Sequence, residues 1–385
     1  MAGALLKPSE VLYILLQCEA RCSETLSMSP SNSTLPIRLG FIGLSATGWA
    51  SNALAPPLFK EPLASKYSLV AVSTTRAESA EASAAKYSKL ASEATGKKVI
   101  VKSYHGSAEQ IAADKDVDMV AVSVRLLGHN EAASKVINAG KDLFIEWPAG
   151  NYSEETRGLY DAAKNKGIRS VAKSIVDSGV LGKTVSATFN VSSVWGNLIF
   201  LDSAKYFLDP SNSLGLIDIL GGHGLDMFTH ILGPISSLSA IAENKAPLIT
   251  ISDSKGKPTD EVLPQTKPTQ YCVNGLLASG ATFSVHFQTA VTETEFLWVI
   301  RGEKGTLRIV DEDAKKTGLF APTPQVYLNG NKVELPAEES RSGLLWEAVA
   351  EDREESYATL EDAVRIRNVL DAILRSSKEG RRIDL

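Results

Sequence analysis

The residues best suited to chemistry form a glycine-containing turn near the start of the chain, Gly43-Leu44-Ser45-Ala46-Thr47-Gly48. An apolar run, residues 37–42, precedes the turn, and a segment of helix-forming residues follows it from Trp49. A strand, a glycine turn and a helix in this order are typical of dinucleotide binding, because the glycines let the backbone approach a pyrophosphate at the positive end of the helix. Ser45 replaces the middle glycine, and a turn without a ligand is the alternative.

A second candidate is Arg76, which follows a valine-rich run, residues 67–74. In nicotinamide-binding folds an acidic residue at this place binds the ribose 2′-hydroxyl. Here the run ends in Ser73-Thr74-Thr75-Arg76, without a carboxylate, and an arginine beside hydroxyl groups can bind a 2′-phosphate. The sequence therefore predicts NADP over NAD. A solvated Arg76 at the start of a helix is the alternative.

A third candidate is a histidine in the second half of the chain. From Gly221 on, apolar residues recur at helical spacing and place His223, Asp226 and His230 near one face of a helix. A histidine that titrates near neutral pH is suited to accept the proton of a carbinol as a hydride leaves. A structural histidine at the helix start is the alternative for His223, and we expect His230 to be structural.

Alternating strands and helices are predicted to position the glycine turn. We expect right-handed βαβ units and an open parallel sheet, with ligands beyond the carboxyl ends of its strands. The polar or aromatic residues at these ends are Ser45, Arg76, Arg125, His129, Glu146 and Trp147. The expected strands cover residues 37–42, 67–74, 99–101, 118–124 and 142–145, and the expected helices cover 77–94, 107–113 with Ser107 as N-cap, 131–139 and 154–166.

Strands follow one another in the second half, which predicts an antiparallel sheet. The expected strands are residues 184–194, 236–242, 270–277, 281–289, 295–301, 305–310 and 325–328, the last before a hairpin turn at Asn329-Gly330. Helices over 344–350 and 360–374 close the chain, with Thr359 and Asp362 as a cap. The predicted fold class is α/β: an N-terminal Rossmann domain and a C-terminal α+β domain with a mostly antiparallel sheet.

Composition limits the function classes. The 385 residues are enough for two domains, and a net charge of -5 without a basic run gives no reason to propose nucleic-acid binding. No apolar stretch is long enough to span a bilayer, and three cysteines make neither a disulfide framework nor a metal site. A reduced, cytoplasmic setting is expected. Residues 1–36 are expected to form a short helix around 8–20 and then a flexible lead-in.

Three segments resemble a known family: GFIGLSATGWA, HNEAASKVINAGKDLFIEWPAG and IRGEKGTLRI. They resemble the glucose-fructose oxidoreductase / inositol dehydrogenase / MocA (Gfo/Idh/MocA) family, in detail its fungal branch that includes the yeast galactose-pathway co-repressor. The resemblance covers residues 37–380. It implies a nicotinamide-binding Rossmann domain over 37–170 and a domain over 171–385 with the substrate site and often the oligomer interface. The implied cofactor-binding residues are Gly43, Ser45, Thr47, Gly48, Trp49, Thr75, Arg76, Arg125, His129, Glu146 and Trp147.

The resemblance also implies catalytic roles. It makes His223 the proton-transfer group, oriented by Asp218 or Asp226, although Asp218 lies five residues before His223 and out of helical register with it. Trp147 stands where most catalytic relatives have lysine, and it cannot carry a proton. Leu126-Leu127 replaces a proline of many relatives, which predicts a changed loop beside His129. A stretch after Arg169 is missing relative to the family.

Three functions follow as hypotheses. The first is an NADP-preferring oxidoreductase that acts, as a homodimer, on a secondary alcohol or carbonyl of a small polyol, sugar or sugar-like metabolite. The second is a catalytically silent dinucleotide-binding regulator with a protein partner, cytoplasmic or nuclear, which the tryptophan at position 147 favours. The third is a degraded paralogue that binds nothing well. Turnover of NADP with a polyol would separate the first from the second.

Overall fold

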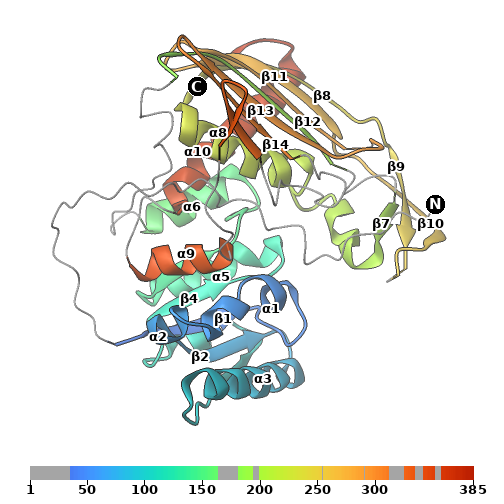
Figure 1. The fold of residues 1–385 in the computed structure, drawn as a ribbon. Coiled ribbons are helices and arrows are strands. Elements are labelled where there is room, and N and C mark those ends of the chain that lie inside the picture. Colours follow the sequence, from blue (N-terminus) through green and yellow to red (C-terminus); the bar gives the residue numbers. More distant parts are fainter. Residues whose placement is uncertain are drawn as a thin grey trace. The chain divides into compact units, whose positions relative to one another are not determined.

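The computed structural model describes residues 35–163, 181–193, 199–253, 255–289, 291–311, 325–333, 341–351 and 357–385. They form two compact units (Figure 1). The N-terminal unit contains the described residues of 35–163 and 341–363, and the C-terminal unit contains those of 181–333 and 364–385. The predictions for residues 8–20 and for the stretch after Arg169 lie outside the described residues.

A five-stranded parallel sheet forms the centre of the N-terminal unit, in the order β3-β2-β1-β4-β5. This is the strand order of a doubly wound dinucleotide-binding fold, so the predicted class is confirmed. The strands are β1 Ile37–Ile42, β2 Tyr67–Thr74, β3 Lys102–His105, β4 Met119–Val122 and β5 Asp142–Ile145.

The predicted third strand was wrong in its position, because β3 begins at Lys102 and not at residue 99. The N–H groups of Val99 and Val101 donate to the hydroxyl oxygens of Ser92 and Ser88 on the preceding helix, over 2.9 Å each. These residues are therefore held by side chains and do not join the sheet.

Helices cover both faces of this sheet, as its continuous apolar strands predict. Two short 3-10 turns, η2 Pro56–Phe59 and η3 Leu126–Gly128, complete the unit. The helices are α1 Trp49–Ala53, α2 Leu63–Lys66, α3 Ala77–Thr95, α4 Glu109–Ala113, α5 His129–Asn138 and α6 Ser153–Ala163. Ser107 lies one residue before the N-cap of α4, and its hydroxyl accepts the N–H of Glu109 over 3.2 Å.

A helix from the end of the chain, α9 Arg341–Ala350, completes the core of the N-terminal unit. The side chain of Trp346 is fully buried, and its indole N–H donates to the carbonyl of Leu54 over 2.9 Å. Its ring contacts Tyr67 and Phe144, with ring centroids 5.4 and 4.7 Å away. The predicted boundary between the domains therefore needs a correction, because this helix belongs to the unit that precedes it in sequence.

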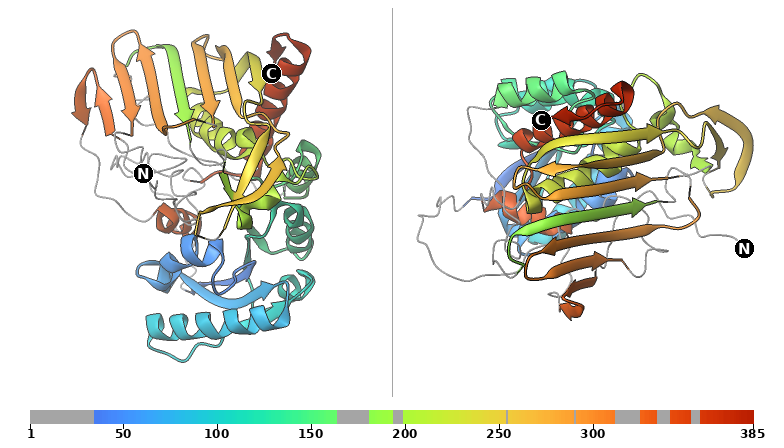
Figure 2. Two further views of the ribbon diagram at one scale, coloured as in Figure 1. Left: turned by 90° about the vertical axis from the view of Figure 1, so that its right-hand side faces the viewer. Right: turned by 90° about the horizontal axis from the view of Figure 1, so that it is seen from above.

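A nine-stranded, mostly antiparallel sheet forms the C-terminal unit, as predicted (Figure 2). Its order is β16-β15-β14-β13-β6-β12-β11-β8-β17, and within the described part of this sheet only β6 and β12 pair in parallel. The strands are β6 Thr184–Ser192, β8 Ile235–Glu243, β11 Gln270–Leu277, β12 Thr282–Gln288, β13 Glu295–Gly302, β14 Thr306–Val310, β15 Gln325–Leu328, β16 Asn331–Val333 and β17 Ile383–Asp384.

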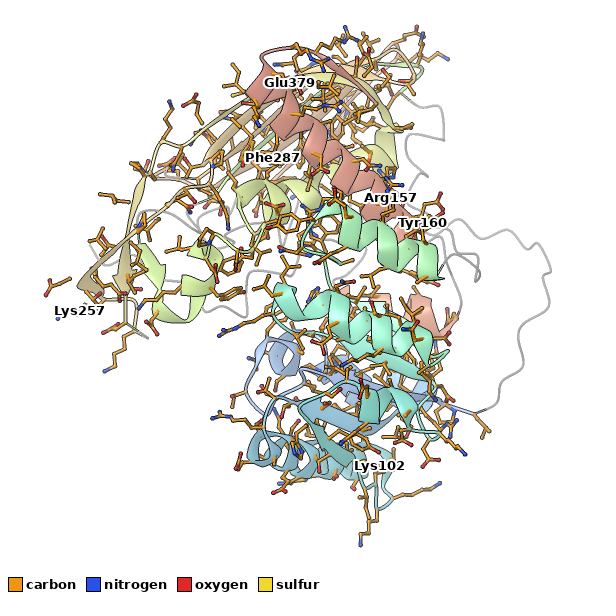
Figure 3. All side chains as sticks on the ribbon, turned by 180° about the vertical axis from the view of Figure 1, so that it is seen from behind. Lys102, Arg157, Tyr160, Lys257, Phe287 and Glu379 are labelled. Atoms are coloured by element: carbon orange, nitrogen blue, oxygen red, sulfur yellow. The ribbon has the colours of Figure 1, made fainter. Side chains whose placement is uncertain are left out.

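One face of this sheet packs against α8 Gly222–Leu232 and α10 Leu360–Glu379 (Figure 2). Aromatic rings fill the contact: Phe228 of α8 lies between Phe189 and Phe283, and Phe287, labelled in Figure 3, meets Phe189 edge to face. A Cβ on Gly224 would lie 3.0 Å from the rings of Phe189 and Phe287. The glycine therefore lets α8 approach the sheet closely.

A smaller sheet was not predicted. It joins β7 Ile199–Leu201, β9 Leu248–Ser252 and β10 Pro258–Pro264 in the order β10-β9-β7. Most side chains of β10 are exposed, so the strand shows none of the apolar alternation on which the sequence prediction depends. Among the described residues, no helix is long and apolar enough to cross a membrane.

Candidate functional site

The glycine turn has the shape that its sequence predicts. Gly43 has φ +89°, and its N–H donates to the carbonyl of Ser73 over 2.8 Å. A Cβ on Gly43 would lie 1.9 Å from the carbonyl oxygen of Ser123, so only glycine fits. A Cβ on Gly48 would lie 2.5 Å from the Ser45 hydroxyl. The turn therefore connects the ends of three neighbouring strands, β1, β2 and β4.

The backbone of this turn leaves donors available. The N–H of Ser45 donates to Gly43, whereas the N–H groups of Leu44, Ala46, Thr47 and Gly48 donate to no acceptor among the described residues. Helix α1 begins directly afterwards but has only five residues, so the donors lie chiefly in the turn. Successive free N–H groups make an anion-binding concavity. The turn fits the pyrophosphate of a dinucleotide.

A carboxyl group faces the start of α1. Oε1 of Glu146, the residue after β5, accepts the indole N–H of Trp49 over 2.7 Å. The hydroxyl of Ser123, the residue after β4, also binds this carboxyl group. Burial raises the pKa of Glu146, and the two donors oppose that shift. Sequence analysis missed Ser123, although it follows β4 as directly as Glu146 follows β5.

Three polar residues at the strand ends are exposed: Thr75, Arg76 and Arg125. The side chain of Arg76, at the N-cap of α3, makes no hydrogen bond or ion pair with the described residues. Its guanidinium group is therefore available for a ligand. Trp147, which follows Glu146, is partly buried, and the Trp147–Pro148 peptide is cis.

His129 differs from its predicted role as a cofactor contact. The residue is 3% exposed, with Nδ1 2.8 Å from the carbonyl oxygen of Pro148 and Nε2 3.0 Å from that of Val124. Burial lowers the pKa of His129, and the two backbone carbonyls oppose this shift. Both ring nitrogens face the protein backbone. His129 therefore holds two loops together, and its geometry does not support a direct contact with the ribose.

His223 lies in the C-terminal unit, in the first turn of α8, and is 6% exposed. Burial lowers its pKa to about 3, well below the near-neutral value that the sequence led us to expect, and a catalytic role for His223 stays a prediction. The ring is neutral under physiological conditions. A neutral imidazole can still accept a proton, but the product is costly until a nearby negative charge stabilises it.

The spacing between Asp218 and His223 has a structural explanation. A π-helical turn, η5 Ile217–Gly221, precedes α8, and the N–H of Gly222 donates to the carbonyl of Ile217 five residues earlier. Such a turn makes residues five apart neighbours, which the α-helical register does not. The π-helical turn therefore shifts the register between Asp218 and His223 away from that of an α-helix. Turns of this kind often occur at functional sites.

Both predicted acidic partners of His223 bind arginines of α10. Oδ1 of Asp218 lies 2.6 Å from the guanidinium of Arg367, and both side chains are buried. Burial raises the pKa of Asp218 and the arginine opposes this. Oδ1 of Asp226 lies 3.0 Å from Arg365, and this pair is about one-third exposed. The orientation of His223 by either carboxylate stays a prediction.

Comparisons with known proteins agree with both units. Residues 37–173 match the oxidoreductase family with an NAD-binding Rossmann fold, and residues 168–311 match the C-terminal domain of Gal80p. A protein named dehydrogenase aclE, from Aspergillus oryzae, is 29% identical over 369 residues, which cover 89% of this chain and 97% of the relative. The galactose/lactose metabolism regulatory protein of Saccharomyces cerevisiae is 24% identical over 310 residues, or 74% and 68% of the two chains.

Solved structures share the fold. A super-repressor mutant of Gal80p from Saccharomyces cerevisiae superposes with a TM-score of 0.76 at 19% identity, over 91% of this chain and 97% of the other. Levoglucosan dehydrogenase in complex with NADH and L-sorbose gives 0.68 at 18% identity, over 91% and 99%. A regulator and a dehydrogenase thus have the same architecture, and the architecture alone does not choose between them.

Proposed function

Because the chain belongs to the Gfo/Idh/MocA oxidoreductase family, we propose that it is an NADP-dependent oxidoreductase. Its substrate would be a small polyol, sugar or sugar-like metabolite with a secondary alcohol or carbonyl group. The observation that carries this proposal is the turn from Gly43 to Gly48, whose free N–H groups suit a pyrophosphate. Arg76 supports the choice of NADP. Its exposed guanidinium lies just after the end of β2, close to the place where an acidic residue would select NAD.

The chain supplies binding and orientation, while a bound dinucleotide would supply the hydride acceptor. In this proposal Glu146, held by Trp49 and Ser123, shapes the site near the ends of β4 and β5. Trp147 offers a flat apolar wall for a ring. His223 has the role of proton acceptor: it would take the carbinol proton while the hydride leaves and the substrate becomes a neutral carbonyl. Its low pKa means that a negative charge close to the ring must stabilise the protonated form.

Calorimetric titration with NADPH and with NADH tests the proposal. The wild type should bind NADPH more tightly. Arg76→Ala should weaken NADPH binding about tenfold or more and leave NADH binding nearly unchanged, because it removes a charged partner of the 2′-phosphate. Arg375→Ala is a matched control, since this arginine is exposed on α10. Turnover with a polyol panel completes the test. Absence of binding for both nucleotides would contradict the proposal.

A regulatory function is the second candidate, and the match of residues 168–311 to the Gal80p C-terminal domain favours it. Trp147 in place of a proton-carrying lysine agrees with it. The regulator would bind the dinucleotide without turnover and would contact a protein partner. Tight NADPH binding without reaction on any substrate of the panel would support this function. A homodimer, and a cytoplasmic location or a nuclear one for a regulator, stay predictions.

A further inference from the structure

Three successive carbonyl groups of the glycine turn are held by one helix. On α3, the Ser83 hydroxyl donates to the carbonyl of Leu44, and the Tyr87 hydroxyl donates to that of Ser45 over 3.4 Å. Lys86 Nζ donates to the carbonyl of Ala46 over 2.7 Å. Residues at positions i, i+3 and i+4 lie on the same helix face, so one face of α3 contacts the whole turn.

Lys86 also connects the turn to the start of α1. Its Nζ lies 2.6 Å from the Ser51 hydroxyl, which itself donates to the Ala46 carbonyl over 3.1 Å. The ammonium group lies 5.1 Å from the centroid of the Tyr87 ring. The lysine is partly buried, and its charge is therefore fixed beside the turn.

The direction of these carbonyls determines the direction of the N–H groups. In a planar trans peptide, the C=O and the N–H of the next residue point to opposite sides. When α3 holds the carbonyls of Ser45 and Ala46, the N–H groups of Ala46 and Thr47 point away from α3. These are two of the groups that find no acceptor among the described residues.

We infer that Ser83, Lys86 and Tyr87 are positioning residues that aim the N–H groups of the turn at the phosphates of the dinucleotide, with Lys86 adding a fixed positive charge. This inference rests on the proposed function, because the ligand is the same dinucleotide. The residues act through the turn and do not themselves touch the reacting atoms. The turn is thus already ordered in the folded protein, and binding of the ligand does not have to include the entropy cost of ordering it.

Hydrogen exchange and calorimetry on the full chain test this inference. In Lys86→Met, we expect faster amide exchange at Ser45 and Ser51, whose N–H groups donate to carbonyls of the turn in the free protein. We also expect a Kd for NADPH about tenfold weaker, because a charged hydrogen bond to the turn is lost. Lys86→Arg should restore much of both, since it keeps the charge and the donors. Lys89→Met is the control, because Lys89 is exposed on the same helix and, among the described residues, pairs only with Glu93, 3.8 Å away.

The outcomes separate this inference from the proposed function. Wild-type binding that persists unchanged in Lys86→Met, or unchanged exchange at Ser45 and Ser51, would overturn the inference alone. A wild type that binds neither NADPH nor NADH would overturn both. Ser83→Ala is the second variant if Lys86→Met does not fold, and it should speed exchange in the same residues. A failed rescue by Lys86→Arg would also count against the inference.

Discussion

The indole N–H of Trp49 donates to Oε1 of Glu146 over 2.7 Å and joins the start of α1 to the end of β5. The two residues are 97 positions apart in sequence, yet both lie at the carboxyl edge of the N-terminal sheet. A hydrogen bond therefore holds the tryptophan beside the glycine turn against the carboxyl group beside Trp147. This contact links the turn that we propose to bind phosphates to the residues that follow β5.

Trp49→Phe should raise the pKa of Glu146 further, because the variant lacks the indole N–H that stabilises the ionised carboxylate. We also expect NADPH binding about three- to tenfold weaker, since the start of α1 loses its attachment. Carbon NMR titration of the Glu146 carboxyl and calorimetry measure the two effects. Glu146→Gln keeps an acceptor for the indole, so it should weaken binding less than Trp49→Phe does. The reverse order would contradict the positioning role of the contact.

The buried histidine predicts a dependence of stability on pH. The folded-state pKa of His223 is about 3, whereas the unfolded value is about 6.5. Between pH 3 and pH 6.5 the unfolded chain therefore binds more protons than the folded chain. Stability should fall as the pH drops below about 6.5, with a contribution from His223 of about 1.4 kcal/mol per pH unit. Chemical denaturation at pH 7 and pH 5 measures this.

His223→Asn should reduce the slope of unfolding free energy against pH by the contribution of His223, about 1.4 kcal/mol per pH unit. His129, whose pKa burial also lowers, contributes its own share and stays in place in the variant. His105→Asn is the control, because this residue lies exposed in β3. An unchanged slope in His223→Asn would show that the ring takes up its proton at nearly the same pH in the folded and the unfolded chain, which would contradict the low pKa.

The ion pair between Asp218 and Arg367 predicts a large loss of stability. Both residues are nearly fully buried, so Asp218→Asn would remove the negative charge that pairs with the Arg367 guanidinium and should cost about 3–5 kcal/mol of unfolding free energy. The double variant Asp218→Asn/Arg367→Met should be less destabilised than the single one. Denaturant titration of the wild type, Asp218→Asn, Arg367→Met and the double variant measures the coupling. Additive losses would mean that the two side chains do not act as a pair.

Lys267 predicts local order. Its Nζ donates to the carbonyls of Phe207 and Leu214 over 3.0 and 2.7 Å and lies 3.0 Å from Oδ1 of Asn212. Burial lowers the pKa of Lys267. Lys267→Met should therefore expose residues 207–214 to faster hydrogen exchange, while exchange in the N-terminal unit stays the same. Lys257→Met, at an exposed lysine labelled in Figure 3, is the control.

The sequence predicted what depends on neighbours in the chain. The glycine turn, the five parallel strands and the cap of Thr359 with Asp362 have local signatures, and the cap is present, with the Thr359 hydroxyl 2.8 Å from Oδ2 of Asp362. The attachment of His129 to the Pro148 carbonyl is different, because it depends on a loop 19 residues away. The low pKa of His223 depends on complete burial. Packing decides both, and no spacing pattern records it.

Helix α9 has a consequence for synthesis of the chain. Trp346 fills the space between Tyr67 and Phe144, so the first unit lacks part of its interior until about nine-tenths of the polypeptide has left the ribosome. The N-terminal half of the chain therefore does not contain all of the residues that form its core. A chain truncated before α9 would have an apolar cavity at the place of the Trp346 indole. Exchange of the N-terminal half between paralogues would therefore have to include α9 as well.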